Sequence, residues 1–363
     1  MIIAPEHKLD IAVKKILVIQ LGDIGDVVWS IPALWALKSA FPRAGLYVIV
    51  RKNRGDFLLD DPHVDGFLIV DEESFFNSLV LIRKIRAEKF DLLFDLRADD
   101  RGAYISLLSG AKIRAAKYYP SIPWRNRMFT HLVEDVPSKQ SPRGASQQSL
   151  KIVRGFGIAE KTAIPRIFVA GGSREKVKRL LMMEKISAEK GFVTINPFSR
   201  WSYKEWGLQK WLQLANFVWQ RYGMPVVVTG SGSERKRAEA LIAEGGAMIY
   251  NLAGRTTLRE MAALLEKSRL HVGVDSAAPH IAAAVGTPTV TLFGPSDWME
   301  WAPPGAKNTV VHSNMDCVPC RQKGCDGHGR SKCLEDLSAE SVQSAVRAAL
   351  EQDGGGWGCD EQR

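Results

Sequence analysis

The chain has little sequence that could enter a membrane. None of its apolar runs approaches the roughly 18 to 20 residues that a bilayer-spanning helix needs. The amino-terminal stretch MIIAPEHKLDIAVKK mixes acidic and basic residues and lacks the apolar core of a signal peptide. We therefore expect a cytoplasmic protein whose contact with a membrane, if there is one, is peripheral.

Cysteine is scarce, with five residues in a chain of 363. Four of them cluster as Cys317, Cys320, Cys325 and Cys333, and Cys359 lies in the tail. In a cytosolic chain such a cluster indicates a metal site or reduced thiols rather than a disulfide framework. Its second half is not the C-x2-C of a zinc ribbon, which favours reduced thiols and leaves a structural metal open.

The fingerprint of a dinucleotide-binding domain is also missing. Gly22 and Gly25 lie in LGDIGDVVWSIPAL (residues 21–34) and permit a tight turn, but they do not form G-x-G-x-x-G. Asp23 and Asp26 lie beside this turn, at the edge of the expected sheet where open α/β folds bind ligands. A carboxylate there can act as a general base, or both aspartates can simply cap the following helix.

Positive charge is in excess. Lys and Arg number 49 against 40 Asp and Glu, which gives a net charge of +9. This balance favours anionic partners such as nucleotides, phosphorylated lipid surfaces or nucleic acid. The length, with 45% hydrophobic and 25% charged residues, fits two globular domains with substantial cores.

Short apolar runs alternate with helical stretches along the chain. The expected strands are Ile16–Leu21, Leu46–Val50, Phe67–Val70, Leu92–Leu96, Ile113–Ala116, Phe192–Asn196, Val226–Thr229, Leu270–Val274 and Thr289–Phe293. The expected helices include residues 31–41, 74–88, 148–157, 208–222 and 338–350. Two such series predict an α/β protein with two doubly wound, Rossmann-like domains and parallel sheets.

The join between the domains is expected near residues 160–172, after a polar break at 136–147. We therefore expect a first domain at 1–166 and a second at 167–350, whose last helix is a candidate to pack back on the first. The stretch after Pro295 is expected to be irregular up to that helix. The tail, 351–363, is expected to be disordered.

Residues 268–297 carry the most informative pattern. A strand runs into Asp275 and Ser276, and an Ala-rich helix follows that ends at Gly286. Ser276 suits the N-cap, and the free N–H groups of such a helix start form an anion site. A carboxylate at Asp275 would repel phosphate but can accept hydrogen bonds from sugar hydroxyls. The pair suggests a ligand with both groups, against the alternative of a capped helix without a ligand.

Three further strand–helix junctions place polar residues at the same edge. They contribute Ser199, Arg200 and Lys204 from INPFSRWSYKEW, Glu234 from VTGSGSERKR, and Thr256 from AGRTTLRE. Each has an ordinary alternative, such as a solvated loop for Lys204 or a helix-start carboxylate for Glu234. Taken together they fit a nucleotide-sugar in the second domain, with a base from the first. That is the layout of GT-B glycosyltransferases, whose two domains face a central cleft.

Three segments resemble glycosyltransferase family 9, the ADP-heptose:lipopolysaccharide heptosyltransferases. They are GDVVWSIPAL (25–34), NPFSRWSYKEW (196–206) and VDSAAPHIAAAVGTPTVTLFGPSD (274–297), and CVPCRQKGC with KCLEDL resembles many members. The resemblance spans most of residues 14–350. It implies inverting transfer of L-glycero-D-manno-heptose from ADP-heptose to an inner-core sugar of lipopolysaccharide. The resemblance further implies that the reaction needs no metal and no cofactor, and the second domain has no metal-binding D-x-D motif. It also implies that the enzyme works at the cytoplasmic face of the inner membrane.

The resemblance also implies residue roles. Asp26 matches the base that deprotonates the acceptor hydroxyl. The donor phosphates would lie near Ser199 and Arg200 and would be neutralised by Lys204. Glu234 would bind the ribose, Thr256 would line the adenosine pocket, and Asp275 would bind the heptose hydroxyls. Ser276 and Ala277 would contact the phosphates at the helix start, with His280 one turn further on. Arg200 stands where a hydroxyl residue is common and Ala277 where glycine is frequent, while Asp23 adds a second acid beside Asp26.

Basic residues of the first domain could meet acidic groups of the acceptor or anionic lipid, or form a solvated surface; they are Arg51, Lys52, Arg54, Arg97, Arg101 and Arg114. Two other functions stay open. One is a family-9-like transferase that uses another nucleotide-sugar or a protein acceptor. The other is a basic nucleic-acid-binding protein with a cysteine-bound metal. That function would not explain the Gly/Asp turn at residues 22–26.

Overall fold

A computed structural model describes residues 1–352 except 4–6, 8, 10, 72–74, 135–143, 188–190, 244–247 and 328, and the side chains of 75–78 and 326 are not described either. Cys359, nearly all of the tail expected to be disordered, and most of the polar break at 136–147 therefore lie outside the described residues. Within the described part of the chain, none of the helices combines the length and apolar character needed to cross a bilayer.

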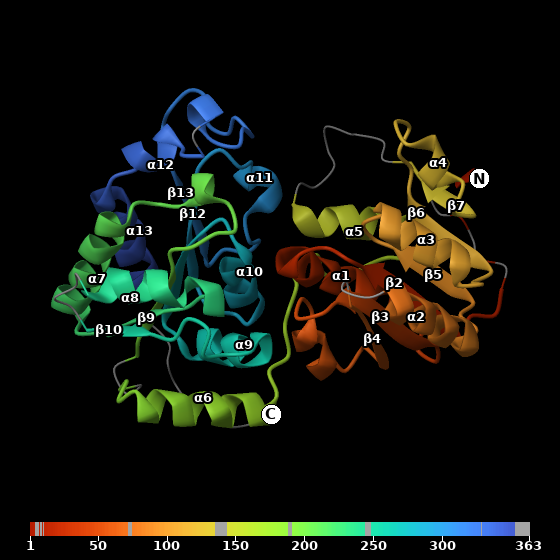
Figure 1. Ribbon diagram of the computed structural model, residues 1–363, viewed down its shortest axis with the longest axis horizontal. Coiled ribbons are helices and arrows are strands. Elements are labelled where there is room, and N and C mark those ends of the chain that lie inside the picture. The colour runs from red at the N-terminus through yellow and green to blue at the C-terminus, as the bar shows by residue number, and fades with distance from the viewer. Residues whose placement is uncertain are drawn as a thin grey trace. The chain divides into compact units, whose positions relative to one another are not determined.

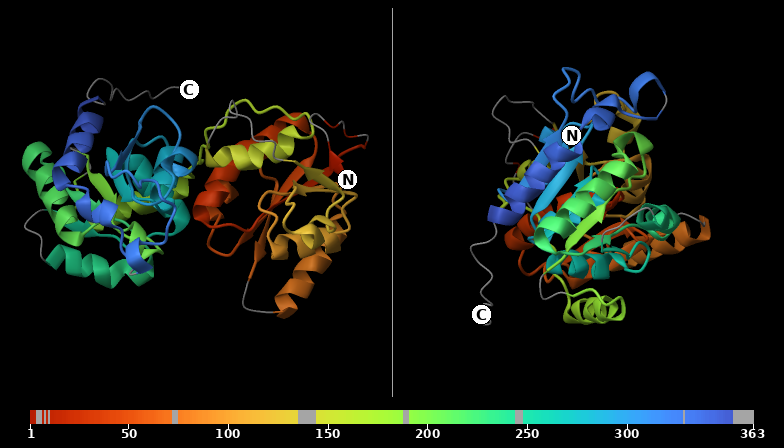
Figure 2. Two further views of the ribbon diagram at one scale, coloured as in Figure 1. Left: turned by 90° about the horizontal axis from the view of Figure 1, so that it is seen from above. Right: turned by 90° about the vertical axis from the view of Figure 1, so that its left-hand side faces the viewer.

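The chain divides into two compact units, Met1–Phe168 and Val169–Arg363 (Figure 1). The division falls two residues after the boundary expected at residue 166. Each unit is built on one parallel β-sheet, and helices lie on both faces of its strands (Figure 2).

The first unit contains a seven-stranded sheet in the order β1-β7-β6-β5-β2-β3-β4. Its strands are β1 (Ile2–Ile3), β2 (Lys15–Gln20), β3 (Gly45–Arg51), β4 (Gly66–Val70), β5 (Leu92–Asp95), β6 (Ile113–Lys117) and β7 (His131–Val133). At the centre, Val18 of β2 lies beside Val48 of β3 and Phe94 of β5. Such continuous apolar strands are typical of parallel sheets that are covered on both faces.

The helices of the first unit are α1 (Ile24–Ala40), α2 (Phe75–Glu88), α3 (Asp100–Leu108), α4 (Pro123–Asn126) and α5 (Ala145–Arg154). The expectation for α1 was wrong at its start, because the helix begins seven residues before Ile31 and runs through Pro32. Asp23 and Asp26 form a capping box that starts it early. Pro32 removes one backbone hydrogen bond, but the helix is largely buried against β2, β3 and α5.

The second unit contains a six-stranded parallel sheet in the order β10-β9-β8-β11-β12-β13. Its strands are β8 (Val193–Asn196), β9 (Val226–Val228), β10 (Ile249–Asn251), β11 (Leu270–Val274), β12 (Thr289–Phe293) and β13 (Asn308–His312). Its helices are α6 (Gly171–Met183), α7 (Leu208–Tyr222), α8 (Arg235–Ala243), α9 (Leu258–Lys267), α10 (Ala277–Ala284), α11 (Trp298–Trp301), α12 (Lys332–Asp336) and α13 (Ala339–Gln352).

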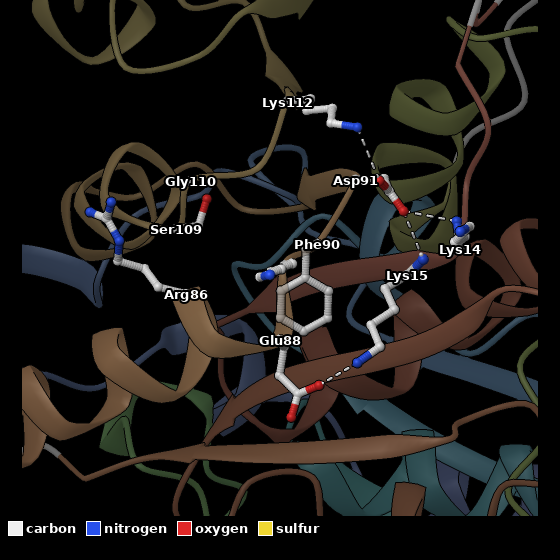
Figure 3. Close-up of a pocket in the computed structure, with 10 residues that line it drawn as sticks. Lys14, Lys15, Arg86, Glu88, Phe90, Asp91, Ser109, Gly110 and Lys112 are labelled. Carbon is white, nitrogen blue, oxygen red and sulfur yellow. Dashed lines mark hydrogen bonds and ion pairs between the residues drawn. The ribbon is translucent and has the colours of Figure 1, made fainter.

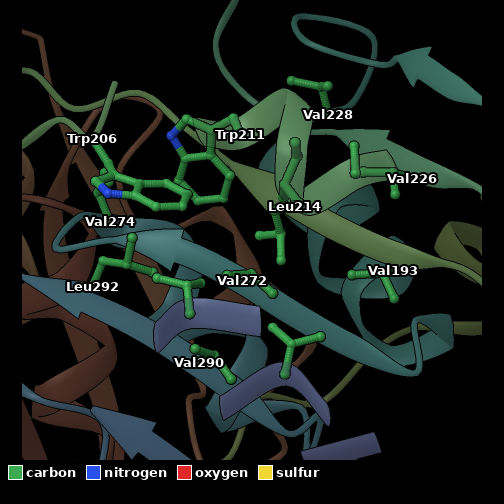
Figure 4. Packing of buried hydrophobic residues seen from close by; sticks show 14 of the residues in the cluster. Val193, Trp206, Trp211, Leu214, Val226, Val228, Val272, Val274, Val290 and Leu292 are labelled. Atoms are coloured by element: carbon green, nitrogen blue, oxygen red, sulfur yellow. The ribbon is translucent and has the colours of Figure 1, made fainter. Parts of the chain in front are cut away.

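Two buried tryptophans anchor the core of the second unit (Figure 4). The rings of Trp206 and Trp211 meet edge to face with their centroids 5.2 Å apart. The indole N–H of Trp206 donates to the carbonyl of Leu337 over 2.9 Å, so its polar atom is satisfied inside the core. Val342 and Val346 of α13 join the same cluster, which ties the last helix to the second unit.

All nine expected strands are confirmed, with ends that differ by at most one residue. The expectation of an irregular stretch after Pro295 was wrong in part, because β13 and α12 lie within it. β13 is an edge strand whose residues are half-buried or exposed, so it has no apolar run that could reveal it.

Candidate active site

The candidate site residues of the first unit lie at the turn between β2 and α1. Asp26 Oδ2 accepts a hydrogen bond from the backbone N–H of Asp23 over 2.9 Å, which satisfies a donor at the helix start. A Cβ on Gly22 would lie 2.4 Å from the Cβ of Asp26, so only glycine lets the carboxylate come this close. The side chain of Asp26 is nevertheless one-third exposed, and it therefore both caps the helix and remains reachable.

An arginine in the loop after the neighbouring strand β5 contacts the carboxylate of Asp26. Arg97 follows β5, and its Nη1 lies 2.6 Å from Asp26 Oδ2. Asp99 lies 3.6 Å from Arg97 and 3.8 Å from Arg51, and Arg54 lies 3.4 Å from Asp23. Three arginines and three aspartates thus alternate along the carboxyl edge of this sheet.

A buried carboxyl supports the turn that carries Arg97. Asp95 Oδ1 accepts hydrogen bonds from the N–H groups of Arg97 (3.1 Å) and Ala98 (2.7 Å), and its Oδ2 has no partner among the described residues. Burial raises the pKa of Asp95 to about 7. The sequence placed Asp95 only inside an apolar strand; its position two residues before Arg97 was the available signal.

The Asp95 pKa predicts a pH dependence of stability. The folded carboxyl keeps its proton up to about pH 7 while the unfolded one loses it near pH 4, so its contribution to stability falls as pH rises through that window. Asp95→Asn should therefore gain stability relative to wild type between pH 5 and pH 8, by about 3 kcal/mol, since roughly two pH units of the window lie in this range. Urea unfolding at the two pH values measures this difference.

Asp65→Asn is the control of opposite sign. Burial alone would raise the pKa of Asp65, but the N–H of Leu46 and the ammonium of Lys38 lower it overall. Its contribution is present above pH 4 and is lost as pH falls, so this variant should lose stability at pH 5 and pH 8 alike. A constant difference between Asp95→Asn and wild type over this range would contradict the assignment.

In the second unit, Lys204 and Asp275, which the sequence placed at one edge of the sheet, form an ion pair that the sequence did not predict. Lys204 Nζ lies 2.6 Å from Asp275 Oδ2, and the carboxylate side chain is only 9% exposed. Lys204 ends a 3-10 turn, Ser202–Lys204, and Asp275 directly follows β11. His280 is buried close to both; burial lowers its pKa to about 4, Asp275 opposes this shift and Lys204 adds to it. The imidazole is therefore neutral at physiological pH.

The start of α10 is not capped by the side chain that precedes it. Ser276 occupies the N-cap position, but its hydroxyl donates to Asn196 Oδ1 over 3.1 Å instead of capping the helix. Asn196 Nδ2 in turn donates to the carbonyl of Thr229. The N–H of Ala277 and its successors thus face the strand edge without a serine cap, as an anion site requires. Sequence reasoning missed Asn196, although it lies in the quoted NPFSRW segment.

The loop after β8 is held by its own contacts. The N–H of Ser199 donates to Glu205 Oε1 over 3.0 Å, and the two oxygens of Glu205 also bind the guanidinium of Arg237. Arg200 is exposed and lies over the ring of Trp201 at 5.5 Å. Glu205, which sequence reasoning did not single out, therefore fixes the segment that leads to Lys204.

Glu234 and Thr256 lie at the next two junctions. Glu234 Oε2 accepts hydrogen bonds from the N–H (2.6 Å) and the hydroxyl of Ser231, which is the helix-start role considered as its alternative. Thr256 is half-buried and precedes Thr257, the N-cap of α9. Their roles at ribose and adenosine stay predictions.

The basic residues of the first unit that the sequence named as candidates for binding acidic groups differ in their contacts. Arg51, Arg54 and Arg97 belong to the charged edge around Asp26, and Lys52 pairs with Asp71 over 3.4 Å. Arg114 is partly buried and donates to two backbone carbonyls, which indicates a structural role.

The cysteine cluster contains free thiols at Cys317, Cys320, Cys325 and Cys333. Burial, followed by the nearness of the other three, raises the pKa of Cys333 to about 11. Among the described residues, no group of three or more His, Cys, Asp or Glu side chains is arranged to hold a metal ion.

Two doubly wound parallel sheets in one chain, each with its polar residues at the carboxyl ends of the strands, define the GT-B class of glycosyltransferases. The sequence model of glycosyltransferase family 9 (heptosyltransferase) matches residues 79–329, and the chain therefore belongs to this family. It is a glycosyltransferase, and the hypothesis of a nucleic-acid-binding protein was wrong.

Individual proteins show the same relationship. Two Escherichia coli proteins are both named lipopolysaccharide heptosyltransferase 3. One is 28% identical, over 77% of this chain and 83% of its own length. The other, from strain K12, is 25% identical, over 91% of this chain and 96% of its own length. The structure of E. coli ADP-heptose lps heptosyltransferase II is similar with a TM-score of 0.76 at 21% identity, covering 93% of this chain and 99% of that one. E. coli heptosyltransferase WaaC with ADP-2-deoxy-2-fluoro heptose gives 0.68 at 17%, covering 92% and 99%.

Proposed function

We propose that the chain transfers L-glycero-D-manno-heptose from ADP-heptose to an inner-core sugar of lipopolysaccharide, with inversion. The observation that carries this proposal is the Lys204–Asp275 pair beside the open start of α10. A cation, a helix start and a sugar-binding carboxylate are what an ADP-sugar requires at adjacent positions. The names of the relatives supply the sugar, and one similar structure contains an ADP-heptose analogue.

Donor binding rearranges the ion pair. The diphosphate competes for Lys204, and Asp275 is released to accept hydrogen bonds from the heptose hydroxyls. When the bond between the heptose C1 and the β-phosphate oxygen breaks, the electron pair leaves with ADP. Lys204 and the N–H groups at the start of α10 stabilise the charge that develops there. His280 is neutral and can donate a hydrogen bond without repelling Lys204.

Asp26 acts as the general base on the acceptor. Its Oδ2 is held by Arg97 and by the N–H of Asp23, so the other carboxylate oxygen takes the proton of the acceptor hydroxyl. The deprotonated oxygen attacks C1 from the face opposite the departing ADP, which inverts the configuration. Arg51 and Arg54 at the same edge can bind acidic groups of the acceptor core.

The first unit is proposed as the acceptor-binding domain and the second as the donor domain. We further propose that the enzyme works at the cytoplasmic face of the inner membrane as a peripheral protein, which the net charge of +9 supports. A transferase with another nucleotide-sugar or a protein acceptor is the competing assignment.

One assay separates these assignments. Purified enzyme is given ADP-heptose, or in parallel another nucleotide-sugar, with a series of truncated lipopolysaccharide acceptors, and nucleotide release is measured together with the mass of each product. We expect a mass increase of one heptose on an acceptor that carries the inner core. Transfer from a different nucleotide-sugar, with ADP-heptose unused on every acceptor, refutes the proposed donor.

A further inference from the structure

The first unit has a pocket that the candidate active site does not use (Figure 3). Lys14 and Lys15 lie at the start of β2, Asp91 directly precedes β5, and Lys112 directly precedes β6. The pocket therefore lies at the amino edge of the sheet, whereas Asp26 and Arg97 follow the carboxyl ends of the same strands. Its volume is about 530 Å³.

The pocket carries an excess of positive charge. Its two acids are already engaged: Glu88 pairs with Lys15 over 2.6 Å, and Asp91 accepts the N–H groups of Lys14 and Lys15 and lies 3.6 Å from Lys112. Arg86 lies across the pocket from these pairs, near Ser109 (Figure 3). Arg86 and Lys89 are exposed, and neither forms an ion pair with a described acid. Their charge therefore faces the solvent.

Exposed apolar side chains border this pocket. α3 ends directly before the lining residues Ser109 and Gly110, and its outward face carries Tyr104, Leu107 and Leu108. The two leucines are 45% and 44% exposed, and their spacing from Tyr104 puts all three on one side of the helix.

Helix stabilisation explains only part of this arrangement. Arg86 and Lys89 lie at the carboxyl end of α2, where cations stabilise the helix dipole. That role does not cover Lys112, whose side chain lies 3.6 Å from Asp91 and is 70% exposed, and it does not explain two large leucines turned toward water. Cations beside a row of exposed apolar side chains are typical of surfaces that bind anionic membranes.

We propose that Arg86, Lys89, Leu107, Leu108 and Lys112, the amino-edge surface, dock the enzyme on a lipid bilayer that contains anionic phospholipids. The pocket receives the phosphate headgroups, and the leucines enter the boundary of the acyl chains. Charge complementarity selects an anionic bilayer over a neutral one, with each cation worth about fivefold in affinity. This inference deepens the proposed function by placing its membrane contact, but lipid binding is measured without turnover.

The test uses the full chain and sedimentation with vesicles of phosphatidylcholine, with and without phosphatidylglycerol. Wild type should bind the anionic vesicles, less so at high salt. Arg86→Gln/Lys89→Gln and Leu107→Ser/Leu108→Ser should each bind at least tenfold more weakly. Met182→Ser/Met183→Ser on α6, where the side chains are 69% and 72% exposed, is the matched control and should bind like wild type.

Two results overturn the inference: binding that is equal for wild type and both surface variants, or binding to neutral vesicles that is as strong as to anionic ones. Melting temperatures check that the variants are folded. Heptose transfer to a water-soluble truncated acceptor should be unchanged in both surface variants. If the wild type transfers no heptose to this acceptor while the vesicle results hold, the proposed function fails and the docking surface stands.

Discussion

Asp26→Asn is expected to lose roughly 10²- to 10⁴-fold in kcat while binding ADP as tightly as the wild type. The amide keeps the shape of the side chain and can still accept the N–H of Asp23, but it cannot take the proton of the acceptor hydroxyl. ADP release under saturating substrates measures kcat, and calorimetry with ADP measures donor binding.

Asp23→Asn is the matched control on the same turn. Asp23 has a half-exposed side chain that lies 3.4 Å from Arg54, and the proposal assigns it no proton transfer. Its turnover should stay within a few-fold of wild type. If instead Asp23→Asn is inactive and Asp26→Asn is active, the base is Asp23 and the assignment made from the resemblance is wrong.

Lys204→Met is expected to have the second large effect, with a loss of roughly 10²- to 10³-fold in kcat and weaker ADP binding. The substitution removes the cation that we propose stabilises the negative charge developing on ADP. It also leaves the carboxylate of Asp275 buried without its partner, which costs about 3–5 kcal/mol of stability. Turnover, ADP affinity and urea unfolding measure the three effects.

A double variant separates stability from catalysis. Lys204→Met/Asp275→Asn removes both charges, so it should recover most of the stability that Lys204→Met loses without recovering turnover. Lys204→Arg keeps the charge and should retain part of both. If Lys204→Met binds ADP as the wild type does, Lys204 does not contact the donor phosphates.

Most strands of both sheets were predictable from the sequence, but β1, β7, β10 and β13 were not. β2 and β3 contain the continuous apolar runs Ile16–Ile19 and Leu46–Val50, and such runs indicate strands covered on both faces. β1 has two residues and pairs with β7, about 130 positions later, so no local pattern marks either strand. β10 and β13 are likewise short edge strands, whose pairing depends on the finished sheet.

The sequence placed several polar residues of the candidate site at the strand edges, but it did not predict which of them contact one another. Parallel strands bring all their carboxyl ends to one edge, which is why Lys204 and Asp275 could both be named from separate segments. Their ion pair, and the contact of Arg97 with Asp26, depend on side-chain directions that spacing does not define. The hydroxyl of Ser276 turned to Asn196 for the same reason, although the sequence correctly placed this serine at the helix start.

The uniform direction of the strands in the first unit has a geometric consequence. β2 contains six residues, and at about 3.3 Å per residue it holds Asp26 and the pocket at Lys15 roughly 20 Å apart. Backbone hydrogen bonds to β3 and β5 fix this length, so side-chain substitutions cannot shorten it. The sheet therefore keeps any ligand bound at its amino edge about one strand length away from the carboxylate of Asp26 at its carboxyl edge.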